Sequence, residues 1–294
     1  MNIGFIGVGS MGRAIIPVLI KAGHEIFAWN RNRDALAGLP GVRVLESPAA
    51  AFKEDIVISL LADDTAVREV LLSCDALQAA DKHCVHIVMS TLSPRLMEEL
   101  QTLHAQRDIG LIAAPVLGVP AVAARGELNI LVAGPEDAIA KAQPVFDVLG
   151  KKTWRLGNHP VHACIAKIAA NMMITQAIES LAEANALADH YGLAPAAFTD
   201  VVTQTLFACP SYQRYGQNIV NSHYEPGFKL SLGLKDINLA LDAASPKGLG
   251  LPAASVVQSR MMAAVAQGLG NRDWSAFASV TAPMRVQTDD EQAT

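Results

Sequence analysis

The sequence predicts a two-domain chain, in which an α/β domain built on a doubly wound parallel sheet precedes an all-α domain built on a long helix. The chain has 294 residues, 51% hydrophobic and 17% charged, and this length exceeds what one compact core usually needs. Up to about residue 160, short apolar runs alternate with stretches of helical periodicity, and after it the pattern is helical only. We therefore predict domains over residues 1–160 and 161–294.

Six short apolar runs in the first part predict strands. They are nearly continuous in apolar residues, as strands buried on both faces of a sheet are. Their alternation with helical patterns favours a parallel sheet with helices on both faces. The runs are NIGFI, EIFAW, DIVISL, CVHIVM, GLIAA and LNILVA.

A long segment, residues 161–191, opens the second part and has no internal Gly or Pro. Gly192 follows it and Pro195 comes shortly afterwards, which is typical of a helix end. Such a helix is on the order of 45 Å long at about 1.5 Å per residue. We expect it to form the backbone of the second domain and to contribute to a homodimer or tetramer.

Charge and composition limit the possible partners. The 23 basic and 28 acidic residues include no basic block, which disfavours nucleic acid and anionic lipid. The four cysteines have no CxxC spacing, as is typical of reduced thiols. The N-terminus lacks the features of a signal peptide, and prolines and glycines break the longest uncharged apolar run, residues 109–124. We expect a cytoplasmic protein without a membrane segment.

A GxGxxG motif follows the first predicted strand directly and precedes the helical pattern MGRAIIPVLIKAG. This context defines the dinucleotide fingerprint of a Rossmann-type domain, with a tight turn, a close backbone approach to the pyrophosphate and a helix N-terminus directed at its charge. A glycine turn without a ligand is the weaker interpretation. The expected cofactor contacts here are Gly7, Gly9, Ser10, Met11 and Gly12.

The end of the second predicted strand bears on the choice of cofactor. NAD-specific domains place an Asp or Glu there to accept the ribose 2′-hydroxyl, but this chain has Asn30, followed by Arg31 and Arg33. Arg31 can stack on the adenine or pair with a 2′-phosphate. Asp34, the competing acid, fits better in the first turn of the next helix. We therefore predict NADP as the cofactor and NAD as the poorer one.

Six motifs occur in order along nearly the whole chain: IGFIGVGSMG with KAGHEIFAWNR, SLLADDTAVREVL, MSTLSP, APVLG, the pair Lys167 and Asn171, and GLKDINLAL. Together they resemble the β-hydroxyacid dehydrogenase family, which includes 3-hydroxyisobutyrate dehydrogenases and glyoxylate or succinic semialdehyde reductases. The family is related to 6-phosphogluconate dehydrogenase. The resemblance implies a dehydrogenase or reductase acting on a small hydroxy acid or carbonyl compound.

The resemblance also implies roles for matching positions. Leu61 and Ala62 would pass under the cofactor, Thr91 would contact its nicotinamide end, and Lys235 would reach the nicotinamide ribose region. Lys167 matches the family's catalytic lysine, and Asn171 matches the asparagine that helps to hold the substrate.

The chemistry of Lys167 and Asn171 agrees with these roles. They are four residues apart, so on a helix they share one face. An ammonium near the reacting oxygen stabilises the developing negative charge and supplies the proton. Oxidation needs the lysine pKa lowered from about 10.4, which burial in apolar surroundings achieves. The alternatives are a lysine whose ammonium reaches water at a helix edge and an asparagine that makes a helix contact.

The substrate loop departs from the family pattern. The family usually has DAPVSGG, whereas residues 113–119 here are AAPVLGV. Ala113 removes the acid and Leu117 removes the hydroxyl, although backbone amides around Gly118 and Val119 could still bind an anion. We expect a bulkier or less acidic substrate than hydroxyisobutyrate or glyoxylate.

Further candidates are weaker. His83, Cys84 and His86 lie close together, but strand alternation puts His83 on the other face, so packing is favoured over a metal site. The aromatic stretch at residues 207–216 could close over the substrate, and helix packing explains it equally well.

Two competing functions remain. Imine reductases share the fold but usually carry Asp or Tyr at the lysine position, so Lys167 argues against them while Leu117 argues mildly for them. A non-catalytic nucleotide-binding module is disfavoured by Lys167, Asn171 and Lys235.

Overall fold

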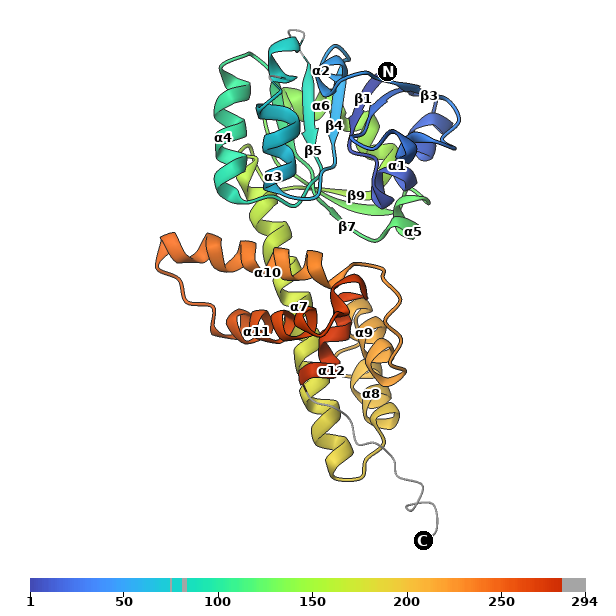
Figure 1. Ribbon diagram of the computed structural model, residues 1–294, viewed down its shortest axis with the longest axis vertical. Coiled ribbons are helices and arrows are strands. Elements are labelled where there is room, and N and C mark those ends of the chain that lie inside the picture. The colour runs from blue at the N-terminus through green and yellow to red at the C-terminus, as the bar shows by residue number, and fades with distance from the viewer. Residues whose placement is uncertain (75, 81–83, 282–294) are drawn as a thin grey trace. The chain divides into compact units, whose positions relative to one another are not determined.

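The computed structural model describes residues 1–74, 76–80 and 84–281 (Figure 1). The chain divides into two compact units, Met1–Lys167 and a second that starts at Ile168. This division falls inside the long helix rather than at its first residue. The predicted position His83 and the polar tail at residues 287–294 lie outside the described residues.

A six-stranded parallel sheet organises the first unit, with the strand order β3-β2-β1-β4-β5-β6. The order reverses at β1, which confirms the doubly wound arrangement and creates a switch point between β1 and β4. The strands are β1 (Asn2–Ile6), β2 (Glu25–Trp29), β3 (Val42–Val44), β4 (Ile56–Ser59), β5 (Val85–Val88) and β6 (Gly110–Ala113).

Helices cover both faces of this sheet (Figure 1). Apolar side chains of α1 (Ser10–Lys21) and α6 (Glu136–Leu149) form one core with the strands. Those of α2 (Pro48–Ala51), α3 (Asp64–Val67) and α4 (Pro94–Ala105) form the other. Apolar side chains therefore cover both faces of the sheet, which explains why the central strands are nearly continuous in apolar residues.

The predicted run LNILVA forms a strand, β8 (Leu128–Val132), but this strand lies outside the six-stranded sheet. It pairs antiparallel with β7 (Val116–Leu117) and parallel with β9 (Gly150–Arg155). The short β3 takes the sixth place instead. β3 and β9 have largely exposed residues with the sequences VRV and GKKTWR, so the apolar pattern gave no signal for either strand. The helix α5 (Pro120–Ala123) connects β7 to β8.

A chain of buried polar groups crosses the second of these cores. His104 Nδ1 lies 2.7 Å from the Leu100 carbonyl oxygen, His86 Nδ1 lies 2.8 Å from His104 Nε2, and His86 Nε2 lies 2.8 Å from Ser59 Oγ. With both imidazoles neutral, one tautomer satisfies every step, because each Nδ1–H donates and each Nε2 accepts. The strand face that carries Cys84 and His86 is therefore a packed interior.

The described residues of the second unit form helices and no strand. They comprise the part of α7 (Val161–His190) from Ile168 onwards, followed by α8 (Pro195–Gln204), α9 (Pro210–Val220), α10 (Leu230–Ala244), α11 (Pro252–Ala266) and α12 (Ala278–Thr281). Its core combines aliphatic residues with Trp274 and Phe277. The long helix is confirmed, and Gly192 follows it with a φ of +81°, a left-handed conformation that favours glycine after a helix end.

By length and composition, α7 could cross a membrane, and it alone among the helices of the described residues meets that test. About two-fifths of its most apolar stretch, 39%, is buried within the protein. The expectation of no membrane segment rested on residues 109–124, which lie outside this helix. Four polar side chains of α7 are buried inside the fold, namely Asn171, Thr175, Glu179 and Asn185, as in a core helix of a globular domain.

Candidate active site

The glycine loop between β1 and α1 has the geometry that a dinucleotide requires. Gly7 has a φ of +94°, and a Cβ on it would lie 2.4 Å from the Leu60 carbonyl oxygen. A Cβ on Gly12 would lie 2.9 Å from the Gly7 carbonyl oxygen, whereas one on Gly9 would meet no atom within 4 Å. The outer two glycines are therefore needed for the fold, and the middle one leaves open space beside the backbone, where a pyrophosphate would fit.

The N-terminus of α1 complements this space. The helix begins at Ser10, has Gly9 as its N-cap residue and carries no acidic residue in its first turn. The first-turn amides of Ser10, Met11 and Gly12 have no acceptors within the helix, so they can bind a phosphate oxygen. The loop thus fits the phosphates of a dinucleotide cofactor.

Asn30 connects this loop to the end of β2. Its Oδ1 accepts a hydrogen bond from the Val8 amide at 2.8 Å, and its Nδ2 donates to the Asn32 carbonyl oxygen at 2.8 Å. The asparagine therefore fixes the backbone on either side of Arg31. The Arg31 side chain is exposed and forms an ion pair with Glu69, with Nη1 and Oε2 3.3 Å apart.

The segments after β4 and β5 meet beside the glycine loop. The Leu61 amide donates to Ser90 Oγ at 2.7 Å, and a Cβ on Gly7 would lie 3.0 Å from Leu61 Cδ2. Ala62 is exposed and Thr91 is half-buried. The structure thus gathers the glycine loop, Leu61 and Thr91 at one edge of the sheet. Sequence analysis missed Ser90, although it stands inside the MSTLSP motif.

Lys167 and Asn171 lie one turn apart on α7. Lys167 is half-buried, and Asn171 is 3% exposed. Since a spacing of four residues places side chains on one helix face, the Lys167 ammonium and the Asn171 amide lie on the same face of α7.

Asp236 on α10 holds the Asn171 side chain and was not foreseen. Asn171 Nδ2 donates to Asp236 Oδ2 at 2.5 Å, and Lys235 Nζ lies 2.9 Å from Asp236 Oδ1. Asp236 is 1% exposed, and the adjacent ammonium offsets the cost of burying its charge. The signal available in the sequence was an acid beside the proposed functional lysine in the largely apolar motif GLKDINLAL.

This contact fixes the orientation of the Asn171 amide. An ionised carboxylate only accepts hydrogen bonds, so the NH₂ group must face Asp236 and the carbonyl oxygen must point elsewhere. Asn171 therefore presents an acceptor, which suits a hydroxyl group or the ammonium of a lysine.

The predicted substrate loop spans the end of β7 and the start of α5. Leu117 is half-buried and packs against the core between the sheet and α4. Gly118 is exposed, and Val119 is the N-cap residue of α5. Ala113, where the family usually has an acid, is fully buried. The loop thus carries an apolar side chain where the family pattern has a hydroxyl.

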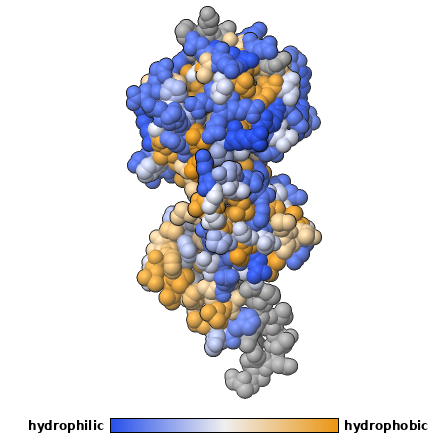
Figure 2. All heavy atoms as spheres, turned by 90° about the vertical axis from the view of Figure 1, so that its left-hand side faces the viewer, coloured by the Kyte–Doolittle hydropathy of each residue, from blue (hydrophilic) through white to orange (hydrophobic). Residues whose placement is uncertain are grey.

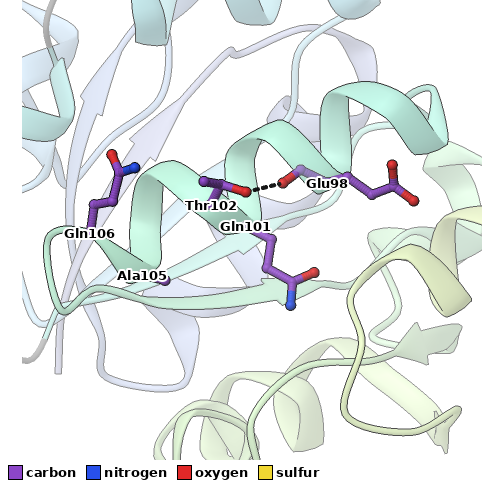
Figure 3. A pocket seen from close by; sticks show the side chains of 5 residues that line it. All are labelled: Glu98, Gln101, Thr102, Ala105 and Gln106. Carbon is purple, nitrogen blue, oxygen red and sulfur yellow. Dashed lines mark hydrogen bonds between the residues drawn. The ribbon is translucent and has the colours of Figure 1, made fainter.

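The remaining described residues contain a pocket but no candidate metal site. A depression of about 620 Å³ lies along α4 and is lined by Glu98, Gln101, Thr102, Ala105 and Gln106 (Figure 3). Four of these side chains come from α4, Gln106 directly follows it, and none of the five is a predicted site residue. Within the described ranges, His, Cys, Asp and Glu form no group of three able to hold a metal ion. Burial raises the pKa of the Cys164 thiol to about 12.

Two family models together span nearly the whole chain. Residues 2–165 match the NAD binding domain of 6-phosphogluconate dehydrogenase, and residues 162–281 match a domain described as NAD-binding of NADP-dependent 3-hydroxyisobutyrate dehydrogenase. The two matches meet at the start of α7.

Curated relatives cover the chain almost completely. The uncharacterized oxidoreductase YfjR of Bacillus subtilis is 37% identical over 94% of this chain and 98% of its own length. Glyoxylate/succinic semialdehyde reductase 1 of Arabidopsis thaliana is 30% identical over 94% of this chain and 96% of its own.

Solved structures share the fold. A 3-hydroxyisobutyrate dehydrogenase from Mycobacterium tuberculosis, solved with L-serine, has a TM-score of 0.87 at 29% identity, covering 95% of this chain and 98% of its own. An imine reductase from Myxococcus stipitatus has a TM-score of 0.63 at 20% identity, covering 94% and 98%, which shows a common fold and no more.

The doubly wound sheet, its glycine loop and the helix α7 with Lys167 and Asn171, together with the named relatives, define an NAD(P)-dependent oxidoreductase. The chain belongs to the β-hydroxyacid dehydrogenase family. The family of dehydrogenases and reductases named by the sequence motifs is thus confirmed.

Proposed function

We propose that the protein is an NADP-dependent dehydrogenase or reductase that interconverts a 3-hydroxy acid and its semialdehyde, or a related small carbonyl compound, with Lys167 as the acid/base. The observation that carries this proposal is the arrangement on α7, where Lys167 precedes by one turn a buried amide held by Asp236. The chemistry named for the Arabidopsis and mycobacterial relatives supports it.

The nicotinamide, when bound, supplies or accepts the hydride. In the reductive direction the Lys167 ammonium stabilises the negative charge that builds on the carbonyl oxygen and donates the proton to it. In the oxidative direction the neutral amine removes the hydroxyl proton. The Asn171 carbonyl oxygen accepts a hydrogen bond from the substrate hydroxyl or from Lys167, which orients the reacting groups.

The substrate loop supports a substrate that is bulkier or less acidic than glyoxylate. Leu117 removes a hydroxyl donor and adds an apolar contact, and Ala113 adds no polar group. A carboxylate would depend on the backbone amides near Gly118 and Val119. A turnover of glyoxylate equal to or better than that of larger aldehydes and ketones would contradict this substrate class.

The preference for NADP is supported by Asn30 and Arg31. The asparagine side chain is occupied by the Val8 amide and the Asn32 carbonyl, so it places no negative charge at the end of β2. Arg31 directly follows it and carries the positive charge that a 2′-phosphate would pair with. The proposal also retains the cofactor contacts expected from the family resemblance, namely Leu61, Ala62, Thr91 and Lys235.

One activity screen tests the proposal against its competitors. Purified protein is assayed with hydroxy acids, aldehydes, ketones and a cyclic imine, with NADPH and NADH for reduction and NADP and NAD for oxidation. We expect turnover of a carbonyl or hydroxy acid substrate with the phosphorylated cofactor. Turnover of the imine alone would favour an imine reductase, and tight NADPH binding without any turnover would favour a nucleotide-binding module.

We further propose a cytoplasmic homodimer or tetramer without nucleic-acid or membrane partners. Hydrophobic side chains gather on the surface of the helical unit (Figure 2), and exposed ones include Met173, Leu187, Tyr191, Val201 and Leu206. Exposed hydrophobic side chains that gather on one surface are typical of interfaces between protein chains, which supports this assembly. Light scattering after size-exclusion chromatography tests the assembly, which a monomer at micromolar concentration would contradict.

A further inference from the structure

The Arg31–Glu69 ion pair spans the edge of the sheet at which the cofactor is expected. Arg31 follows the end of β2, and Glu69 lies in the helical turn η2 (Arg68–Leu72), which follows β4 and α3. Because β1 lies between β2 and β4 in the sheet, the ion pair reaches across the strand that leads into the glycine loop. In a domain of this type the adenosine ribose lies at the end of β2, beside this pair.

Glu69 is therefore a carboxylate close to the group proposed to bind the 2′-phosphate. Arg31 Nη1 and Glu69 Oε2 are 3.3 Å apart, and the two side chains are 78% and 58% exposed. Arg33, the second arginine of the segment, pairs with Glu46. Each positive charge at the β2 end is thus matched by a carboxylate, and the surface offered to a phosphate has less positive charge than the sequence NRNR suggests.

We propose that Glu69 is a specificity-determining residue that holds Arg31 and thereby limits how strongly the protein prefers NADP to NAD. A 2′-phosphate must share the guanidinium with Glu69 or displace it, whereas the 2′-hydroxyl of NAD carries no charge and makes no such demand. The pair thus weakens NADP binding selectively. This inference rests on the proposed role of Arg31 in the proposed function.

The test is a set of binding titrations without substrate, using the change in NADPH and NADH fluorescence at low ionic strength. Wild type is compared with Glu69→Gln, Arg31→Gln and the double variant. An exposed ion pair is worth up to about 1 kcal/mol, so Glu69→Gln should tighten NADPH binding by about two- to fivefold. NADH affinity should change by less than about twofold, and salt should reduce the gain.

The double variant separates the proposed cause from simple charge repulsion. If Glu69 acts by holding Arg31, its substitution should give no gain once Arg31 is glutamine. An unchanged ratio of NADH to NADPH affinity in Glu69→Gln would overturn the proposal, and so would an equal gain in both Arg31 backgrounds. Glu25→Gln is the matched control, because Glu25 pairs with Arg43 at the opposite end of β2.

Failure of the proposed function gives different results. If Arg31→Gln leaves NADPH affinity unchanged, Arg31 is not the 2′-phosphate ligand, and both the cofactor preference and the role of Glu69 are wrong. If the affinities behave as expected but no compound is turned over, only the proposed reaction is wrong.

Discussion

The Asn171 side-chain amide donates a hydrogen bond to Asp236 across 2.5 Å, and both residues are buried. Because the carboxylate can only accept, it sets which end of the amide faces away from it. An Asp236→Asn substitution removes this constraint and also removes the negative charge 2.9 Å from the Lys235 ammonium.

We expect Asp236→Asn to lower the free energy of unfolding by about 1–3 kcal/mol and to reduce kcat. In a double-mutant cycle with Asn171→Ala, the two substitutions should show a coupling energy of about 0.5–3 kcal/mol. Urea unfolding and steady-state kinetics provide the measurements. Asp242→Asn, an exposed acid on the same helix, is the control. Strict additivity would show that the contact has no energetic role.

Lys167→Ala should reduce kcat by about 10²- to 10⁴-fold, the usual contribution of a positioned acid/base. NADPH affinity should stay within about twofold of wild type, since the proposed role belongs to the transition state. Lys247→Ala, which removes an exposed lysine, should change neither quantity. Parallel losses in turnover and cofactor affinity would argue against the assigned role.

Gly9→Ala should separate cofactor binding from folding. Its Cβ would meet no protein atom within 4 Å, so the free energy of unfolding should change by less than about 0.5 kcal/mol. The same Cβ would occupy the space proposed for the pyrophosphate, and losing charge-assisted hydrogen bonds there should weaken NADPH binding about tenfold or more. Gly250→Ala, also in open space, should bind normally. A wild-type NADPH affinity in Gly9→Ala would show that the pyrophosphate does not bind beside Gly9.

Leu117→Ser should shift the substrate preference towards small carboxylates. The new hydroxyl restores the donor of the family pattern, and a hydrogen bond to a charged group is worth about 1.5–3 kcal/mol. We expect kcat/KM for glyoxylate to rise about tenfold while that for larger carbonyl compounds does not rise. Leu39→Ser, at another half-buried leucine, controls for lost packing. An equal change in kcat/KM for all substrates would show that the loop does not determine substrate specificity.

The paired histidines predict a loss of stability in acid. Burial lowers the pKa of His104 to about 4, with a smaller lowering from Arg107 and an opposing contribution from the Leu100 carbonyl. Burial also lowers the pKa of His86 well below 6.5, and His104 adds to this. Between pH 6.5 and about 4 the unfolded chain therefore binds protons that the folded chain does not. As the pH decreases through this range, the free energy of unfolding should decrease by about 1.4 kcal/mol per pH unit for each histidine.

His104→Leu tests this by removing one of the two groups. It should reduce the pH dependence of stability between pH 4 and 6.5 and cost about 1–3 kcal/mol at pH 7, since the His86 Nδ1–H loses its acceptor. Urea unfolding at several pH values measures both effects. His223→Gln, at an exposed histidine, is the matched control, and a pH profile of His104→Leu identical to that of wild type would refute the assignment.

Local signals made the fold and the glycine loop predictable from the sequence. The loop follows directly from Gly7, Gly9 and Gly12 in a strand–turn–helix setting, and the long helix from an uninterrupted run ending at Gly192. β3 and β9 escaped prediction because their residues are mostly exposed and polar, so no apolar periodicity marks them.

The supporting residues of the site were harder to predict because they are distant in sequence. Asp236 is 65 positions from Asn171, and Glu69 is 38 positions from Arg31. The local sequence around Asn171 or Arg31 does not indicate which residue will contact it, because the packing of separate elements brings the two side chains together. The sequence therefore showed the motif around each residue but not the contact with its carboxylate.

The hydrogen-bond chain from Ser59 through His86 to His104 also provides the first unit with an internal spectroscopic reporter. Each imidazole keeps an Nδ1 proton in a buried hydrogen bond, so these two protons exchange slowly with water while the surrounding core is closed. Their proton resonances should be visible by NMR in the folded protein and vanish when this core opens. The integrity of the cofactor-binding unit can thus be followed separately from that of the helical unit, without a label and without a substrate.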